Sequence, residues 1–145
     1  MDSKITLAVS QLAASQRRVI SRPQALDCGM TPKQIVHAVR SGRWQPLHPG
    51  VYLTHTGRVD WHVRAWAALL RAGPGASLSH ASAAYLWGLE TSAPSMLRVA
   101  TPGQRTIVRP PGTRVTRRRS VEVVKRQGYR LTSVRQTDLD LTAEP

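Results

Sequence analysis

Residues 31–54 have the sequence TPKQIVHAVRSGRWQPLHPGVYLT, in which a short helical pattern runs into a hairpin pattern. Thr31 and Gln34 are spaced as in a capping box, and Pro32 fits the first helical position, where its missing N–H is not needed. A glycine follows the pattern, as is common after the last turn of a helix. We therefore expect a helix over residues 32–41.

The same arrangement occurs one helix earlier. Residues 21–29, SRPQALDCG, place Ser21 and Gln24 at capping-box spacing and Pro23 in the first turn, which predicts a helix over residues 22–28. A glycine and a methionine then lead to the cap of the next helix. Two short helices joined by a tight turn that contains glycine are typical of a helix-turn-helix.

A hairpin pattern follows the second of these helices. Residues 44–54 alternate around Pro49 and Gly50, a pair suited to the central positions of a type II turn. Pro46 has no N–H for a strand ladder, so the first arm is expected at a sheet edge. Together with a helix predicted near the N-terminus, over residues 4–15, the hairpin predicts a winged helix-turn-helix.

The composition changes from Asp60 onward. Two helical patterns come first, the second with Ser79 as a candidate N-cap. Beyond Pro94 three segments, MLRVATP, TRVTRRRS and SVEVVKR, alternate as strands do, and a last helical pattern, SVRQTDLDL, follows. We expect an α+β protein with an N-terminal winged helix-turn-helix domain, residues 1–57, and a small mixed α/β C-terminal domain, residues 58–145.

The charge of the chain is strongly unbalanced. There are 21 Lys and Arg residues against 8 Asp and Glu residues, which gives a net charge of +13. Such an excess bears on partners rather than on fold, and the usual polyanionic partner is nucleic acid. No acidic residue occurs between Asp27 and Asp60 or between Glu90 and Glu122. These two stretches are the candidate contact surfaces.

The helix predicted over residues 32–41 has one basic and one apolar side at about 100° per residue. The second helix of a helix-turn-helix enters the major groove, where base edges require long side chains that form hydrogen bonds. The expected contacts with double-stranded DNA are Lys33, Gln34, His37 and Arg40, opposite an apolar side made of Ile35, Val36, Ala38 and Val39.

Three further arginines flank this helix-turn-helix. Arg43 comes just before the wing, and Arg17 and Arg18 come before the first of the paired helices. We expect them to contact the DNA backbone, which fixes register without carrying sequence information.

Two alternatives stay open for the helix over residues 32–41. A surface helix is polar on its outer side even when it binds nothing, and a Gln34 that closes the capping box is not free to bind an adenine.

The second acid-free stretch is rich in arginine. It offers a second DNA surface, a patch for an acidic protein, or a solvated face. On a strand, Arg117 and Arg119 would face one way and Arg118 the other. The arginines of this stretch are Arg98, Arg105, Arg109, Arg114, Arg117, Arg118 and Arg119.

Metal and catalytic chemistry find little support. No two of the five histidines have the i, i+4 spacing of a helical zinc site, and a single cysteine, Cys28, leaves no intrachain disulfide. Ser79 and His80 are adjacent and are expected to point in different directions on a helix, so Ser79 is interpreted as a cap rather than a nucleophile. Asp138 and Asp140 form the only acidic pair suited to a divalent ion. We expect no metal, no cofactor and no enzymatic activity.

No segment of the chain is suited to a membrane. The longest apolar run, AWAALL at residues 65–70, is too short to cross a bilayer, and the N-terminal residues make a poor secretory signal. We expect no membrane contact and a cytoplasmic location.

The order of three segments resembles a known family. VISRPQALDCGMTPKQIVHAVRSGRWQPLHPGVYLTH, AGPGASLSHASAAYLWGL and RLTSVRQTDLDL are similar to the AbiEi-type antitoxins of bacterial toxin–antitoxin systems, most strongly over residues 19–54 and 72–89. The resemblance implies a DNA-binding antitoxin that represses its own operon at upstream repeats, with a nucleotidyltransferase-type toxin encoded beside it. In that family the C-terminal domain is associated with neutralising the toxin, and no direct toxin contact is assumed.

The chain departs from the family pattern near its end. Asp138 stands between Thr137 and Leu139, where the family has an apolar residue, and relatives commonly continue beyond the position of Pro145 through more helix or a Vsr-like nuclease domain. An incomplete C-terminal domain is therefore one expectation. Two alternative functions stay open: an RNA-associated basic protein that uses the arginine-rich region 98–119, and a remnant of a Vsr-like nuclease fusion.

Overall fold

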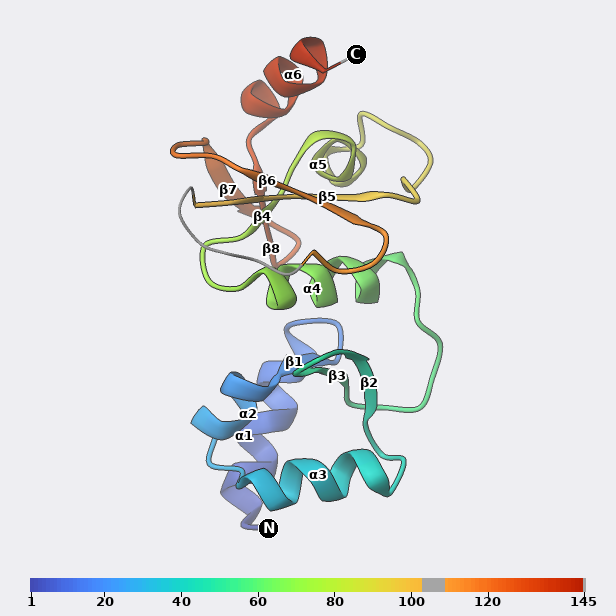
Figure 1. Ribbon diagram of the computed structural model, residues 1–145, viewed down its shortest axis with the longest axis vertical. Coiled ribbons are helices and arrows are strands. Elements are labelled where there is room, and N and C mark those ends of the chain that lie inside the picture. Colours follow the sequence, from blue (N-terminus) through green and yellow to red (C-terminus); the bar gives the residue numbers. More distant parts are fainter. Residues whose placement is uncertain (103–108, 145) are drawn as a thin grey trace. The chain divides into compact units, whose positions relative to one another are not determined.

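The computed structural model describes residues 1–102 and 109–144 and has two compact units, Met1–Arg71 and Ala72–Pro145. The sequence-based expectation of an α+β protein with a winged helix-turn-helix first is confirmed (Figure 1). From the N-terminus, the elements up to the end of the first unit are α1 (Ser3–Ala14), β1 (Val19–Ser21), α2 (Arg22–Asp27), α3 (Pro32–Arg40), β2 (Gln45–His48), β3 (Val51–Leu53) and α4 (Trp61–Ala72).

The first unit, which is described throughout, has one antiparallel sheet with the strand order β1-β3-β2. β2 lies at an edge, as Pro46 requires, and its register with β3 shifts between Pro46 and His48. β1 was not predicted from the sequence. It is three residues long and pairs with a strand far along the chain, Val19 opposite Leu53, so no local pattern marks it.

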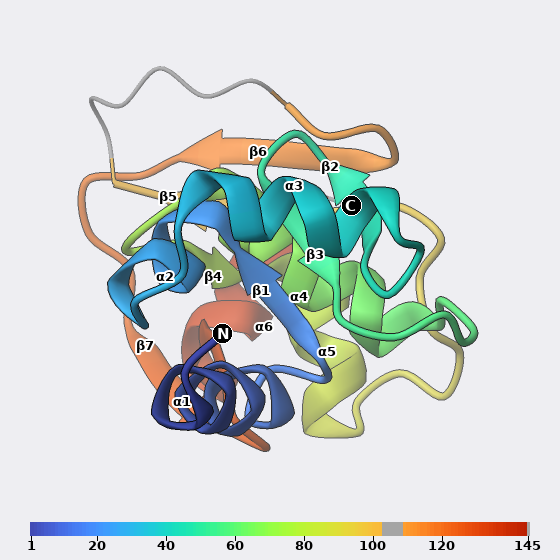
Figure 2. The same cartoon turned by 90° about the horizontal axis from the view of Figure 1, so that it is seen from below.

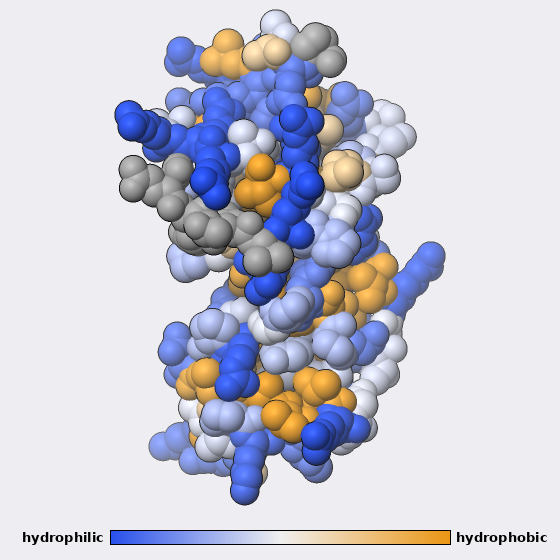
Figure 3. Space-filling model, in the orientation of Figure 1, coloured by the Kyte–Doolittle hydropathy of each residue, from blue (hydrophilic) through white to orange (hydrophobic). Residues whose placement is uncertain are grey.

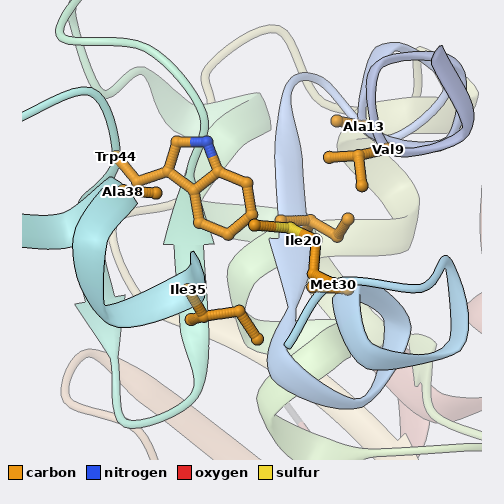
Figure 4. Close-up of a cluster of buried hydrophobic side chains, with 8 residues drawn as sticks. Val9, Ala13, Ile20, Met30, Ile35, Ala38 and Trp44 are labelled. Carbon is orange, nitrogen blue, oxygen red and sulfur yellow. The ribbon is translucent and has the colours of Figure 1, made fainter. Parts of the chain in front are cut away.

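Both faces of this sheet are covered. On one face, Ile20 and Tyr52 lie among apolar side chains of the first three helices and the indole of Trp44, which the close-up in Figure 4 shows between Ala38 and Ile20. Figure 2 shows α1, α2 and α3 from this side of the unit. The buried residues of this cluster are Val9, Ala13, Ile20, Ala25, Met30, Ile35, Ala38 and Trp44.

The other face of the sheet packs against α4. Val19 and Leu53 contact Val63 and Ala67 of that helix, and all four side chains are buried. The sequence placed a boundary between residues 57 and 58, near the change in composition. The compact units divide instead after Arg71, because α4 completes the apolar cluster of the first sheet.

The described part of the second unit contains a five-stranded mixed sheet with the order β6-β5-β4-β8-β7. Its parallel pairs are β4 with β8 and β5 with β6, and the others are antiparallel. α5 packs against both β5 and α6. The elements are β4 (Ser77–Leu78), α5 (His80–Trp87), β5 (Leu97–Thr101), β6 (Thr113–Arg117), β7 (Val123–Arg126), β8 (Tyr129–Thr132) and α6 (Val134–Ala143).

The alternation beyond Pro94 correctly predicted β5, β6 and β7, whereas β4 and β8 were not predicted. β4 has only two residues, Ser77 and Leu78, and it becomes a strand because Leu78 pairs with both Val99 and Leu131. Across residues 1–102 and 109–144, none of the helices combines the length and hydropathy that crossing a membrane requires.

Candidate nucleic-acid interface

Two capping boxes fix the N-termini of α2 and α3. At α3, the Thr31 hydroxyl accepts the backbone N–H of Gln34 at 3.2 Å, and the Gln34 side-chain oxygen accepts the backbone N–H of Thr31 at 2.9 Å. Ser21 and Gln24 make the equivalent pair of bonds at α2. Both boxes predicted from the sequence are confirmed, and each satisfies two N–H groups that a helix otherwise leaves unpaired.

The turn between α2 and α3 requires glycine. Gly29 has φ +110°, a conformation that residues with a side chain rarely adopt. A Cβ atom at this position would also lie 3.0 Å from Cγ1 of Ile5 on α1. The turn between α2 and α3 therefore packs closely against α1.

α3 exposes one continuous face. Lys33, Val36, His37 and Arg40 are exposed and follow the i, i+3, i+4, i+7 spacing of a single helix face. We call these four residues the recognition face. In the described chain, Lys33, His37 and Arg40 form no ion pair, in agreement with the absence of acidic residues between positions 27 and 60.

Two residues of α3 do not fit the division into a basic and an apolar side that the sequence suggested. Val36 was placed on the apolar side but has 44% of its surface exposed. The buried side is set by Ile35 and Ala38, and at 100° per residue Val36 points about 130° away from their mean direction. Gln34 is only half-exposed, and its side-chain oxygen accepts a hydrogen bond in the capping box. The sequence alone left open whether Gln34 caps the helix or contacts a base, and the structure shows the capping role.

The wing lies beside arginines of other elements. Arg43 is exposed three residues beyond the end of α3, and its Nε donates to Ser41 Oγ at 3.3 Å. At the hairpin turn, the backbone N–H of Arg22 donates to the carbonyl of Gly50 at 2.8 Å, and Arg71 Nη1 donates to the carbonyl of Pro49 at 3.3 Å. Arg22 and Arg71 did not stand out in the sequence, because the contact between the wing tip and their helices is long-range.

Arg17 and Arg18 are not placed beside α3. They form the turn between α1 and β1, where the backbone N–H of Thr54 donates to the carbonyl of Arg18 at 2.8 Å. Their side chains line an open groove of about 610 Å³ together with Arg58 and residues at the start of α4. Ser10, Gln11 and Ala14 of α1 also line this groove, which therefore lies between α1 and the start of α4, and no residue of α3 lines it.

Some arginines of the second acid-free stretch pair with acidic residues near the C-terminus. Glu144 at the end of α6 approaches Arg98 at 3.1 Å and Arg114 at 3.5 Å, and Asp140 approaches Arg118 at 2.6 Å. The acids missing from the stretch itself are thus supplied by the C-terminal helix.

Three arginines of that stretch keep exposed side chains that make no ion pair with the described residues. They are Arg109, Arg117 and Arg119. Arg105 lies outside the described residues. Arg118 is less exposed than its two neighbours, but β6 ends at Arg117, so the expected strand does not extend to Arg118 and Arg119.

Ser79 and His80 form an arrangement that the sequence-based expectation missed. Ser79 occupies the N-cap position of α5, yet its hydroxyl makes no capping bond and lies 2.9 Å from Nδ1 of His80. The two side chains meet because His80 has φ +51° instead of a helical value. Nε2 of His80 lies 2.8 Å from Glu144, and both Ser79 and His80 are buried, so this cluster joins α5 to α6 inside the second unit.

Burial has a larger effect on the pKa of His80 than its acidic neighbours have. Burial lowers the pKa of His80 below its usual value, and Arg98 acts in the same direction, whereas Asp140 and Glu144 act against them. The imidazole is therefore neutral near pH 7, and its Nε2–H donates to the Glu144 carboxylate. The hydrogen bond from Arg98, aided by the positive charges around it, lowers the pKa of Glu144.

The pair Asp138 and Asp140 does not converge on one site. Asp138 is exposed, whereas Asp140 is buried and bound to Arg118 and to the side-chain amide of Gln136 at 2.9 Å. Two residues apart on a helix, the two carboxylates point to different sides. Over residues 1–102 and 109–144 there is no group of three His, Cys, Asp or Glu side chains suited to a metal ion.

A comparison with protein families matches residues 8–55 to a family described as "Transcriptional regulator, AbiEi antitoxin". The matched range runs from α1 to the end of β3 and covers about a third of the chain. It confirms the resemblance seen over residues 19–54, while residues 72–89 lie outside it. A search of curated proteins finds no match for the chain.

Proposed function

We propose that this chain, whose residues 8–55 match the AbiEi antitoxin family of transcriptional regulators, binds double-stranded DNA sequence-specifically and represses its own toxin–antitoxin operon. The DNA sites are repeats upstream of the operon. The recognition face enters the major groove, where Lys33 and Arg40 donate to guanine edges and His37 contacts a base or a phosphate.

The observation that carries this proposal is the isolation of the basic side chains on α3. Lys33, His37 and Arg40 project from one side of a rigidly capped helix, and no carboxylate of the described chain neutralises them. An ordinary surface helix of a globular protein mixes both signs of charge. A row of cations without counter-charges favours a polyanion, and a helix-turn-helix makes duplex DNA the polyanion that fits.

Arginines around the wing supply the backbone contacts. Arg43 is exposed three residues beyond the end of α3, and Arg22 at the start of α2 lies at the tip of the wing. Guanidinium groups bind phosphate strongly and without regard to sequence. We assign Arg43 and Arg22 to phosphates that flank the groove in which α3 lies. Arg17 and Arg18, the backbone contacts expected from the sequence, line the groove between α1 and the start of α4, and we do not assign them to the phosphates that flank α3.

The antitoxin role rests on the family match and on the second unit being a separate compact body. In this proposal, residues 72–145 act in neutralising a nucleotidyltransferase-type toxin encoded beside the chain, and no catalytic step is assigned to the chain itself. We favour DNA over the RNA-binding alternative, because three arginines of its region, Arg98, Arg114 and Arg118, pair with Glu144 and Asp140.

Two cellular assays test the two halves of this proposal. The full chain should repress a reporter placed behind the DNA upstream of its own gene, and a Lys33→Ala/His37→Ala/Arg40→Ala variant should not. Both should rescue growth when the neighbouring gene product is expressed, because the substitutions leave the second unit unchanged. An unrepressed reporter would refute the autorepressor role, and failed rescue by the wild-type chain would refute the antitoxin role.

A further inference from the structure

The recognition face contains one residue whose chemistry differs from that of its neighbours. Val36 lies one turn from Lys33 and one turn from Arg40, and 44% of its surface is exposed. Apolar side chains also reach the surface among hydrophilic ones in the part of the first unit that carries α3 (Figure 3). The face is therefore a short apolar contact edged by cations.

The fold does not need this valine. Trp44, Ile35 and Ala38 fill the apolar cluster beneath α3 and are buried, whereas Val36 is not a member of either cluster of the first unit. Valine is also a weaker helix former than alanine. The side chain thus contributes little to folding, and its exposed methyl groups are available to a ligand that approaches α3.

The cations beside Val36 indicate what that ligand is. Lys33 and Arg40 on the adjacent turns favour an anionic surface, and Arg43 continues the positive charge beyond the helix. In the major groove of DNA, only the 5-methyl group of thymine offers an apolar contact at a base edge. A phosphate-lined groove with a methyl group on its floor matches a cationic helix face that carries an exposed valine.

We infer that Val36 is a specificity-determining residue that packs against the 5-methyl group of a thymine in the DNA site. This inference rests on the proposed function. The thymine lies between the base pairs contacted by Lys33 and Arg40, since Val36 lies between those residues along the helix. Gln34 has no part in this readout, because its side-chain oxygen closes the capping box.

The test removes single methyl groups from the DNA. The tightest duplex recovered by in vitro selection with the full chain is prepared with each thymine replaced in turn by deoxyuridine, which lacks only the 5-methyl group. Wild-type protein should lose affinity about fourfold at one thymine of a site, the change expected for about one buried methyl group. Val36→Ala should bind the thymine and deoxyuridine duplexes equally at that position.

Val59→Ala is the matched control. Val59 is also an exposed valine of the first unit, 40% exposed, but it lies outside α3, so this variant should keep the wild-type penalty. The inference is overturned if Val36→Ala loses as much affinity as wild type at the sensitive thymine, or if no thymine is sensitive. In either case the recovery of a preferred duplex by selection would still support DNA recognition. A selection that yields no preferred duplex refutes the proposed function and this inference together. A lower molecular mass of Val36→Ala in sedimentation would also overturn it, because Val36 would then lie between two copies.

Discussion

The side-chain oxygen of Gln34 accepts the backbone N–H of Thr31 at 2.9 Å, which joins the first turn of α3 to its own cap. Gln34 was also a candidate for base contact, and the two roles compete for the same amide. We expect Gln34→Ala to lower the free energy of unfolding by about 1 kcal/mol, the usual value of a capping interaction. The ratio of affinities for specific and scrambled duplexes should stay unchanged. Urea unfolding and competition binding measure the two quantities, and a changed ratio at unchanged stability would restore Gln34 as a base contact.

Arg43 tests the assignment of backbone contacts. Arg43→Gln should weaken binding to all duplexes alike and should lower the slope of log affinity against log salt by about 1, because one phosphate contact is lost. Arg119→Gln, which removes an exposed arginine of the second unit, serves as the control and should leave the slope unchanged. Salt titrations on specific and scrambled duplexes provide the measurement. A loss confined to the specific duplex would mean that Arg43 contacts a base.

Arg17 and Arg18 distinguish the sequence-based assignment from the structural one. Both side chains line the groove between α1 and the start of α4, and no residue of α3 or of the wing strands lines that groove, so the double variant Arg17→Gln/Arg18→Gln should keep the wild-type salt slope. A slope lowered by about 2 would show that both arginines bind phosphates, as the sequence alone suggested. Gln is preferable to Gly here, because Arg17 and Arg18 have φ values of +56° and +69° and glycine would change the stability of the turn.

Some features of the fold and of the site could be predicted from the sequence, and others could not. Capping boxes, helix ends and the proline–glycine turn depend on residues three or four positions apart, and all of them were predicted. The strand Val19–Ser21 was not, because its partner is more than 30 residues away. The exposure of Val36 depends on which side of α3 meets Trp44 and Ile20, which the periodicity of nine residues does not define. His80 and Glu144 are in contact although they are 64 positions apart in the sequence, so no local motif predicts this contact.

The cluster around His80 predicts a pH dependence of stability. Because burial lowers the pKa of His80 below 6.5, the unfolded chain takes up a proton before the folded chain as the pH falls. Stability should therefore decrease as the pH falls from 7.5 through 6.5. The lowered pKa of Glu144 adds a second loss below pH 4.5, where the unfolded and then the folded carboxylate become protonated.

Urea unfolding of the full chain at pH 7.5 and 6.0 measures the effect. His80→Gln should show a smaller decrease between these two values than wild type. Some decrease should remain, because the pKa values of His48 and His62 are also lowered, chiefly by burial. His37→Gln, an exposed histidine, is the control. A wild-type protein that gains stability as the pH falls would mean that Glu144 and Asp140, rather than burial, determine the charge of His80.

Fluorescence anisotropy can measure whether α3 recognises a DNA sequence. Labelled duplex from upstream of the gene is compared with scrambled duplex and single-stranded RNA at two salt concentrations, for wild type and the Lys33→Ala/His37→Ala/Arg40→Ala variant. We expect wild type to prefer the upstream duplex, and we expect the variant to lose this preference while it keeps salt-sensitive background binding. No preference in the wild type, a preference for RNA, or an undiminished preference in the variant would contradict this expectation.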